Sequence, residues 1–258
     1  MTEWTTWEPF AMPQPRRWRT PRHVVVVPDL FDVASGVADV AEVWAVMATL
    51  PQHTFQVTTW EGHDRMRSLL TSPGFGDLVR SRAAREGGTA DLPWPLPNVW
   101  VGVGVRDQEQ ATLRVPDLLA IPAAVRFVWA QPLVGPLDLG QAAQALDWLL
   151  LGGDIGPASR PLQPAWARAL RDQCTAAGVA FHFIGWGSWA PVRPPERLVG
   201  QVGHRQIMRQ VGFAHAGRVL DDHTWEEMPT AGKGARGARR DSDRTTQGLL
   251  FGEEGGGR

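Results

Sequence analysis

Apolar residues follow two alternating patterns along the chain: short continuous runs, and longer stretches in which they recur every three or four residues. Residues 23–27 (HVVVV) form a β-branched run that is typical of a parallel strand buried on both faces. Residues 37–50 carry an apolar stripe at helical spacing, with Asp39 and Glu42 outside it. The pattern of a strand followed by a helix repeats along the chain, which predicts parallel strands joined by helical crossovers.

We expect six strands, at residues 23–27, 54–58, 99–105, 125–128, 147–151 and 179–184. We expect helices at residues 37–50, 64–70, 108–119 and 164–177, and a surface excursion over residues 72–97, which glycine and proline interrupt. An open doubly wound sheet and an incomplete barrel both fit this α/β pattern. We favour a partial (β/α) barrel of about six parallel strands, within a domain of residues 1–229.

In both architectures ligands bind where the carboxyl ends of the strands meet. The side chains expected at this rim are Asp29, Asp32, Arg106, Asp107, Trp129, Gln131, Asp154, Trp186 and those of residues 58–61. The candidates for chemistry are Asp29, Asp107, Gln131 and Asp154. The candidates for ligand binding are Gly152, Gly153, Asp154, Trp129 and Trp186, because glycines let backbone N–H groups approach an anion or a nucleotide. A rim of purely structural loop residues is the alternative.

The chain has one cysteine, Cys174, which lies four residues from Leu170 on the apolar side of a predicted helix and is therefore expected in the core. One cysteine excludes both an intramolecular disulfide and a site built from several thiolates. The seven histidines are isolated, so no metal site is predicted, and no dinucleotide or P-loop fingerprint occurs. A net charge of -1 provides no global attraction to nucleic acid.

Several long motifs occur in a fixed order: residues 21–31, 50–59, 98–108 (NVWVGVGVRDQ), 125–139, 146–161 (LDWLLLGGDIGPASRP) and 217–229 (GRVLDDHTWEEMP). In these motifs the chain resembles the phage-associated, radical-SAM-like, three-cysteine-motif family of phage Gp proteins. The resemblance covers most of residues 1–229. It implies a radical-SAM-like partial barrel, a [4Fe–4S] cluster held by three cysteines near the N-terminus, and a phage-encoded protein in the cytosol of the bacterial host.

This chain departs from the family where chemistry is expected. It passes from Phe10 to Pro15 without the cysteine-bearing segment. Trp129 and Gln131 stand where the family has a small residue and a glutamate, and Asp154 replaces a glutamate after the double glycine. A lysine that the family carries near residue 184 is also absent. Because reductive cleavage of S-adenosylmethionine needs a cluster held by three thiolates, we expect neither that cluster nor S-adenosylmethionine, and we predict no cofactor.

Residues 230–258 are poor in apolar side chains and are expected to form a disordered tail. Within it, Gln247, Leu250 and Phe251 belong to the string QGLLF, which resembles the peptide that binds the bacterial DNA sliding clamp. A hydrophobic end that packs back on the domain is the alternative. The basic residues of the tail are Lys233, Arg236, Arg239, Arg240 and Arg244. They predict either weak, salt-sensitive contacts with nucleic acid or a solvated linker.

The leading hypothesis is a non-catalytic, iron–sulfur-free relative of this family that acts as a binding or accessory protein in phage DNA metabolism. A cysteine-containing paralogue is a candidate partner. The rival hypothesis is an enzyme that reuses the rim, with Asp29, Asp107 and Asp154, for cluster-independent nucleotide or nucleobase chemistry. A third is an interaction module tethered to the sliding clamp. No apolar stretch approaches the roughly 18 residues of a membrane span, so the cytosol is the expected location.

Overall fold

The computed structural model describes residues 3–9, 15–27, 29–31, 35–89, 91–192 and 207–229. Asp32 and the tail, with its sliding-clamp peptide and basic residues, therefore lie outside the described residues. The junction between Phe10 and Pro15, where the resemblance leads us to expect a cysteine-bearing segment, is described only from Pro15 onward.

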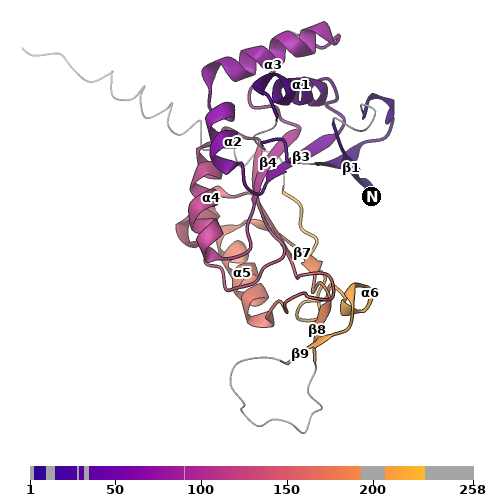
Figure 1. The fold of residues 1–258 in the computed structure, drawn as a ribbon, viewed down its shortest axis with the longest axis vertical. Coiled ribbons are helices and arrows are strands. Elements are labelled where there is room, and N and C mark those ends of the chain that lie inside the picture. Colours follow the sequence, from indigo (N-terminus) through magenta and orange to yellow (C-terminus); the bar gives the residue numbers. More distant parts are fainter. Residues whose placement is uncertain are drawn as a thin grey trace, which may run out of the picture.

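One curled sheet of parallel strands forms the centre of the fold, and its strands follow one another in sequence order (Figure 1). The strands are β1 (Glu3–Trp7), β2 (Arg22–Val26), β3 (Thr54–Thr59), β4 (Val99–Gly104), β5 (Val125–Ala130), β6 (Trp148–Gly152) and β7 (Ala180–Gly185). This half-barrel confirms the predicted partial (β/α) barrel. It has seven strands rather than six, because β1 was not recognised as a strand in the sequence.

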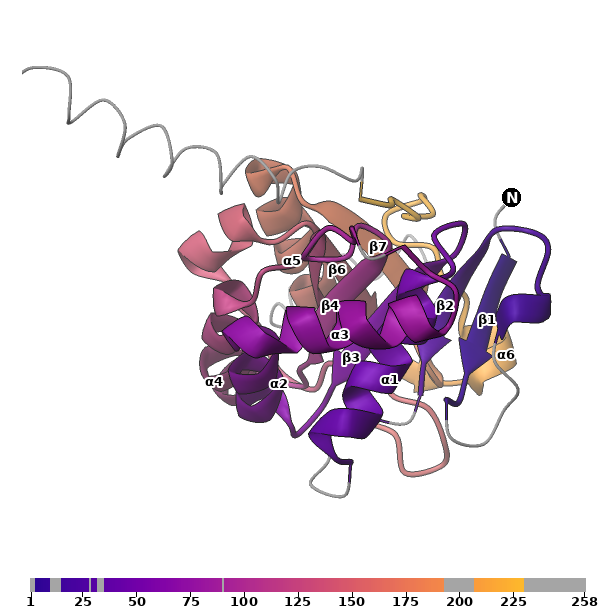
Figure 2. The same ribbon diagram turned by 90° about the horizontal axis from the view of Figure 1, so that it is seen from above.

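Five helices lie along the outer, convex side of the sheet (Figures 1 and 2). They are α1 (Val37–Ala48), α2 (His63–Leu70), α3 (Pro73–Arg85), α4 (Gln108–Ala120) and α5 (Pro164–Ala177). Two short 3-10 turns, η1 (Pro15–Arg17) and η2 (Gly140–Ala145), lie between β1 and β2 and between β5 and β6. Cys174 of α5 is 0% exposed in the core between helices and sheet, as expected. Burial raises the pKa of its thiol to about 12, and the Glu227 carboxylate adds to the rise.

The expected surface excursion over residues 72–97 is wrong in its first half, which forms the helix α3. Phe75, Val79 and Ala83 recur four residues apart and bury one side of this helix against α1. The Phe75 ring lies 6.0 Å from that of Trp44 and 5.7 Å from that of Trp94. The charged residues between these positions and the neighbouring glycines obscured the helical spacing in the sequence.

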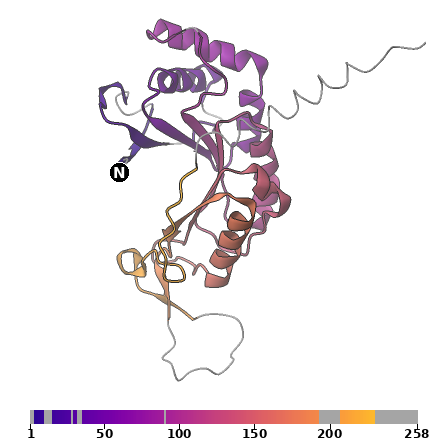
Figure 3. The ribbon, with the colours of Figure 1, turned by 180° about the vertical axis from the view of Figure 1, so that it is seen from behind.

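The chain beyond β7 returns to the sheet. A short antiparallel pair, β8 (Trp189–Pro191) and β9 (Met208–Gln210), and the single turn α6 (Phe213–Ala216) extend past the end of β7. The next segment runs back beside β7 (Figure 3): the Phe183 N–H donates to the Trp225 carbonyl (2.8 Å), and the Glu227 N–H donates to the Phe181 carbonyl (3.2 Å). The Trp148 indole also donates to the Glu227 carbonyl (2.9 Å), which fastens this segment to β6.

Candidate functional site

The two faces of the sheet differ in what their side chains meet. Along β3, Phe55 and Val57 join the large core beneath the helices, whereas Gln56 and Thr58 alternate with them and face the concave side. On β4 to β6 the concave side carries a second, smaller apolar cluster of Trp100, Val125, Phe127, Trp148 and Leu150. The concave face is thus the inside of the half-barrel, and its carboxyl end is where ligands bind in this class of fold.

Four aromatic rings cross the concave face towards the amino ends of the strands. His23 lies 5.6 Å from Trp100, Trp100 lies 5.7 Å from Trp148, and Trp148 lies 6.0 Å from His182, measured between ring centroids. We call these residues the four-ring belt. Burial lowers the pKa of both His23 and His182, so the two histidines at the ends of the belt favour the neutral form.

At the carboxyl end of the concave face, side chains cover the glycines of the sheet. A Cβ added to Gly104 would lie 2.3 Å from the Trp60 indole, and one added to Gly102 would lie 2.4 Å from the Phe127 ring. Both distances are far below van der Waals contact, so only glycine lets these rings lie directly on β4. Aromatic side chains therefore line the concave face over these two positions of β4.

Three half-buried side chains and one exposed arginine form the mouth of the half-barrel. Trp60 lies beyond the end of β3, and the guanidinium of Arg106 lies 5.8 Å from its ring centroid. On β5 and just after it, the Trp129 indole donates a hydrogen bond to the Gln131 side-chain oxygen (3.1 Å). Trp129 is the strand partner of Gly104, the residue that Trp60 covers. These four side chains are the mouth residues.

Below the mouth, two buried polar side chains lack partners. Gln56 is 0% exposed and Thr58 is 8% exposed. Among the described residues, the Gln56 amide nitrogen, the Gln56 amide oxygen and the Thr58 hydroxyl find no hydrogen-bond partner. Buried polar groups are nearly always paired with protein, water or a ligand. Gln56 and Thr58 are therefore the strongest sign of a binding function on this face.

The three predicted rim aspartates each accept hydrogen bonds from the backbone. Asp29 accepts from the N–H groups of Phe31 and Trp60, both at 2.9 Å. Asp107 caps α4 by accepting from the Gln110 N–H (3.0 Å). Asp154 accepts from the N–H groups of Ile155 (2.9 Å) and Arg160 (3.1 Å) in the loop after β6. These contacts give each carboxylate a structural role, and a catalytic role stays a prediction.

The predicted ligand-binding glycines lie against other parts of the chain. A Cβ on Gly152 would lie 2.8 Å from the Gln131 side chain, and one on Gly153 would lie 2.1 Å from the Trp186 carbonyl oxygen. The Trp186 indole itself is buried and donates to the Val219 carbonyl (3.0 Å). Of the predicted site residues, the structure thus brings Trp129, Gln131 and Gly152 together at the mouth.

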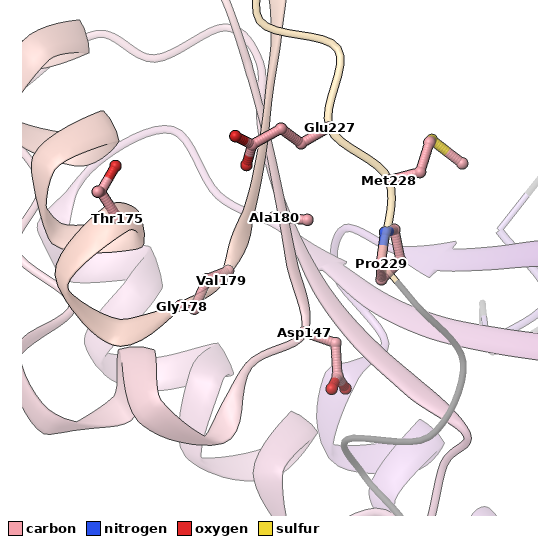
Figure 4. Close-up of a pocket in the computed structure, with 8 residues that line it drawn as sticks. All are labelled: Asp147, Thr175, Gly178, Val179, Ala180, Glu227, Met228 and Pro229. Carbon is pink, nitrogen blue, oxygen red and sulfur yellow. The ribbon is translucent and has the colours of Figure 1, made fainter.

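Two pockets lie away from the mouth. One, of about 380 Å³, is at the amino ends of β6 and β7 and includes Asp147 and Glu227 (Figure 4). There the Glu227 carboxylate accepts from the Phe181 N–H (2.9 Å) and Asp147 accepts from the Arg126 N–H (2.8 Å). The other, of about 610 Å³, lies between α5 and the segment after α6. The first pocket is at the amino-terminal end, which usually serves stability in such barrels. The second is lined in part by Trp186, a predicted ligand-binding residue that follows the end of β7.

The chain does not fit the iron–sulfur cluster that the resemblance implies. Its single thiol, Cys174, lies among the helices on the convex side, whereas the mouth opens on the concave side. One thiol cannot supply three thiolate ligands. In the described part of the chain, no three His, Cys, Asp or Glu side chains gather in a way that could hold a metal ion.

Comparison with known proteins identifies one family. A family described as "Protein of unknown function (DUF5131)" matches residues 2–229. No curated protein and no solved structure matches the chain. None of the helices within the described ranges has the length and apolar character to cross a membrane.

Proposed function

The chain belongs to the DUF5131 family of proteins of unknown function, and we propose that it is a binding or accessory protein of phage DNA metabolism that works without an iron–sulfur cluster. Its ligand binds on the concave face of the half-barrel, at the carboxyl ends of the strands. Its place of action is the cytosol of the bacterial host.

The observation that carries this proposal is that the chain has a single cysteine and that this cysteine is buried. Cys174 is fully buried, and burial raises its pKa to about 12, so the thiol stays protonated at neutral pH. The chain holds no second cysteine. This chain by itself therefore cannot catalyse a reaction that depends on a cluster held by three thiolates.

The concave face supports binding. Trp60 and Trp129 offer half-buried indoles at the mouth, and indoles are large contact surfaces that order at low entropic cost. Gln56 and Thr58 hold unpaired hydrogen-bonding groups below them. Most small-molecule sites combine such apolar walls with a few convergent polar groups.

Anaerobic reconstitution with iron, sulfide and S-adenosylmethionine tests the proposal. We expect no stoichiometric cluster and no cleavage of S-adenosylmethionine. A stoichiometric cluster with cleavage activity in the purified chain would overturn the proposal. A cysteine-containing paralogue is a proposed partner, so the reconstitution is repeated with such a protein where the same genome encodes one.

Cluster-independent chemistry at the rim is the competing proposal and has weaker support. Asp29, Asp107 and Asp154 already accept backbone hydrogen bonds. Thermal-shift measurements with nucleotides, with and without Mg²⁺, separate the two, because a bound ligand raises Tm by mass action. A shift that requires Mg²⁺ and disappears in Asp154→Asn would favour chemistry at the rim.

The C-terminal sequence supports a second partner. We propose that Gln247, Leu250 and Phe251 dock on the DNA sliding clamp, with the two apolar side chains in a hydrophobic groove. The basic residues between 233 and 244 add weak, salt-sensitive contacts with DNA. Deletion of residues 247–251 is expected to abolish capture of the chain by an immobilised clamp. Unchanged capture would contradict the docking.

A further inference from the structure

Gln56 and Thr58 support an inference that rests on the proposed binding function and names its ligand. We propose that these two side chains hydrogen-bond the edge of a planar heterocyclic base, free or as part of a nucleotide, inside the half-barrel. The base lies on the concave face, between the four-ring belt and the mouth residues Trp60 and Trp129.

The unpaired atoms of Gln56 and Thr58 are the first support. The three side-chain polar atoms of these two residues find no partner among the described residues, although a buried polar group without a hydrogen bond destabilises the fold. Both side chains come from one strand, two residues apart, and point to the same face. An unpaired group at a single position would be an isolated defect, whereas two adjacent ones on one face form a recognition surface.

The chemistry of the amide selects the ligand edge. Gln56 presents a hydrogen-bond acceptor and a donor side by side, and Thr58 presents a hydroxyl that can act as either. Their complement is an edge with a neighbouring donor and acceptor. Each of the nucleobases carries such an edge, and glutamine is known to form two parallel hydrogen bonds with that of adenine. A sugar stacks on indoles as well, but its many hydroxyls exceed the three atoms available here.

The surroundings select a flat and uncharged ligand. Strand pairing places Gln56 beside Trp100, a member of the four-ring belt, and Thr58 beside Gly102, which the Phe127 ring covers. Base rings stack favourably on such aromatic side chains. His23 and His182 favour the neutral form because burial lowers the pKa of each.

Access to the site passes the mouth. Gln56 has no solvent contact, so a base reaches it only when a covering side chain turns aside. Trp60 and Trp129 are half-buried and lie on the carboxyl side of Thr58. Arg106, which is exposed and near the Trp60 ring, is positioned to contact the phosphate of a nucleotide whose base has entered.

The experiment uses the full chain and measures binding by calorimetry and by thermal shift. The probes are adenine, guanine, cytosine and uracil, their 5′-monophosphates, and a short single-stranded DNA, which together distinguish a free base from a nucleotide or a polymer. The variants are Gln56→Leu and Thr58→Val, singly and together, which keep the approximate volume and remove the polar atoms. Thr54→Val is the matched control on the same strand, because Thr54 lies beside His23 and has no unpaired buried atom among those described.

The variants are expected to change the free and bound states in opposite directions. Without ligand, removal of unpaired buried groups raises Tm by about 2–4 °C for the double variant. With a base present, the ligand-induced rise in Tm becomes smaller. The apparent affinity calculated from this rise falls at least tenfold. The control keeps both values of the parent chain.

Three outcomes overturn the inference. Absence of a thermal shift or binding heat with every base, nucleotide and oligonucleotide excludes the ligand class. Unchanged base binding in the double variant excludes Gln56 and Thr58 as its recognition groups. A lower Tm in the unliganded double variant indicates that bound water already pairs these atoms. None of these results affects the reconstitution experiment, so failure of this inference is distinguishable from failure of the proposed function.

Discussion

The Thr59 hydroxyl donates a 2.6 Å hydrogen bond to the Asp29 carboxylate and so joins the rims of two neighbouring strands. The same carboxylate accepts from the Trp60 N–H (2.9 Å), and the Thr59 oxygen in turn accepts from the Gly62 N–H (2.9 Å). This network fixes the backbone at the point where Trp60 turns over Gly104. Asp29 therefore acts on the mouth through the position of Trp60.

Asp29→Ala is expected to lower the free energy of unfolding by about 2–3 kcal/mol, because two backbone N–H groups and a buried hydroxyl lose a charged acceptor. Chemical denaturation measures this loss. Asp154→Ala is the control, since its two hydrogen bonds are exposed and their loss is expected to cost under about 1 kcal/mol. Equal stability of Asp29→Ala and the parent chain would show that the network does not hold the rim.

Gly102→Ala is expected to destabilise the chain by about 1–3 kcal/mol, the usual cost of overpacking a core. The added Cβ would lie 2.4 Å from the Phe127 ring, which is fully buried and cannot move into solvent. A second change, Phe127→Leu, is expected to cost less in the Gly102→Ala background than in the parent chain, because the two positions share one space.

The matched control for this substitution is Gly74→Ala. A Cβ at Gly74 meets no atom within 4 Å, and the residue lies in the first turn of α3. Alanine there is expected to be neutral or stabilising by up to about 1 kcal/mol. Thermal denaturation of both variants compares the two positions, and a similar loss at both would refute the specific contact with Phe127.

The Cys174 thiol is expected to be unreactive towards thiol reagents in the folded chain at pH 8. Burial raises its pKa to about 12, so only roughly one thiol in 10⁴ is ionised at that pH, and the thiolate is the reactive form. Labelling with a chromogenic disulfide should therefore follow unfolding and become rapid in denaturant. Rapid stoichiometric labelling without denaturant would contradict the buried position.

Much of the fold was predictable because its signals are local. The helix α5 begins and ends at the predicted residues, with Pro164 in its first turn and Gly178 in the left-handed conformation at its end. The strand β1 was missed because it is short and its two tryptophans are separated by polar residues; Trp7 joins the core through an edge contact with Phe55. β1 pairs with β2 in parallel. This pairing, and not the pattern of apolar residues in its own sequence, makes the segment a strand.

The candidate site was predictable only in part. Trp129, Gln131 and Gly152 were expected at the rim, and parallel pairing brings them together there. Asp29 was also expected, but its partner Thr59 lies 30 residues away, so no local pattern could predict their hydrogen bond. Gln56 was missed, although a glutamine inside an apolar strand was the available signal. That the Gln56 amide finds no hydrogen-bond partner among the described residues depends on the packing of the whole fold and could not be predicted from the local sequence.

The stability of the chain is expected to decline as the pH falls below about 6.5. Burial lowers the pKa of His182 from its ordinary value of 6.5; nearby Glu226 opposes this shift and Arg218 adds to it. Burial likewise lowers the pKa of His23. Because the unfolded chain binds protons at these histidines at a higher pH than the folded chain, protonation favours unfolding. Stability is thus complete above pH 6.5 and is lost as the pH falls towards the folded-state pKa values.

Thermal denaturation between pH 5 and pH 8 measures this dependence. Tm is expected to fall on acidification, and the fall should be shallower in the double variant His23→Gln and His182→Gln, which removes the two histidines at the ends of the four-ring belt. His215→Gln is the control, because that histidine is exposed on α6 and its loss leaves the concave face intact. An unchanged slope in the double variant would assign the acid sensitivity to other groups and would mean that the belt histidines are solvated in the folded chain.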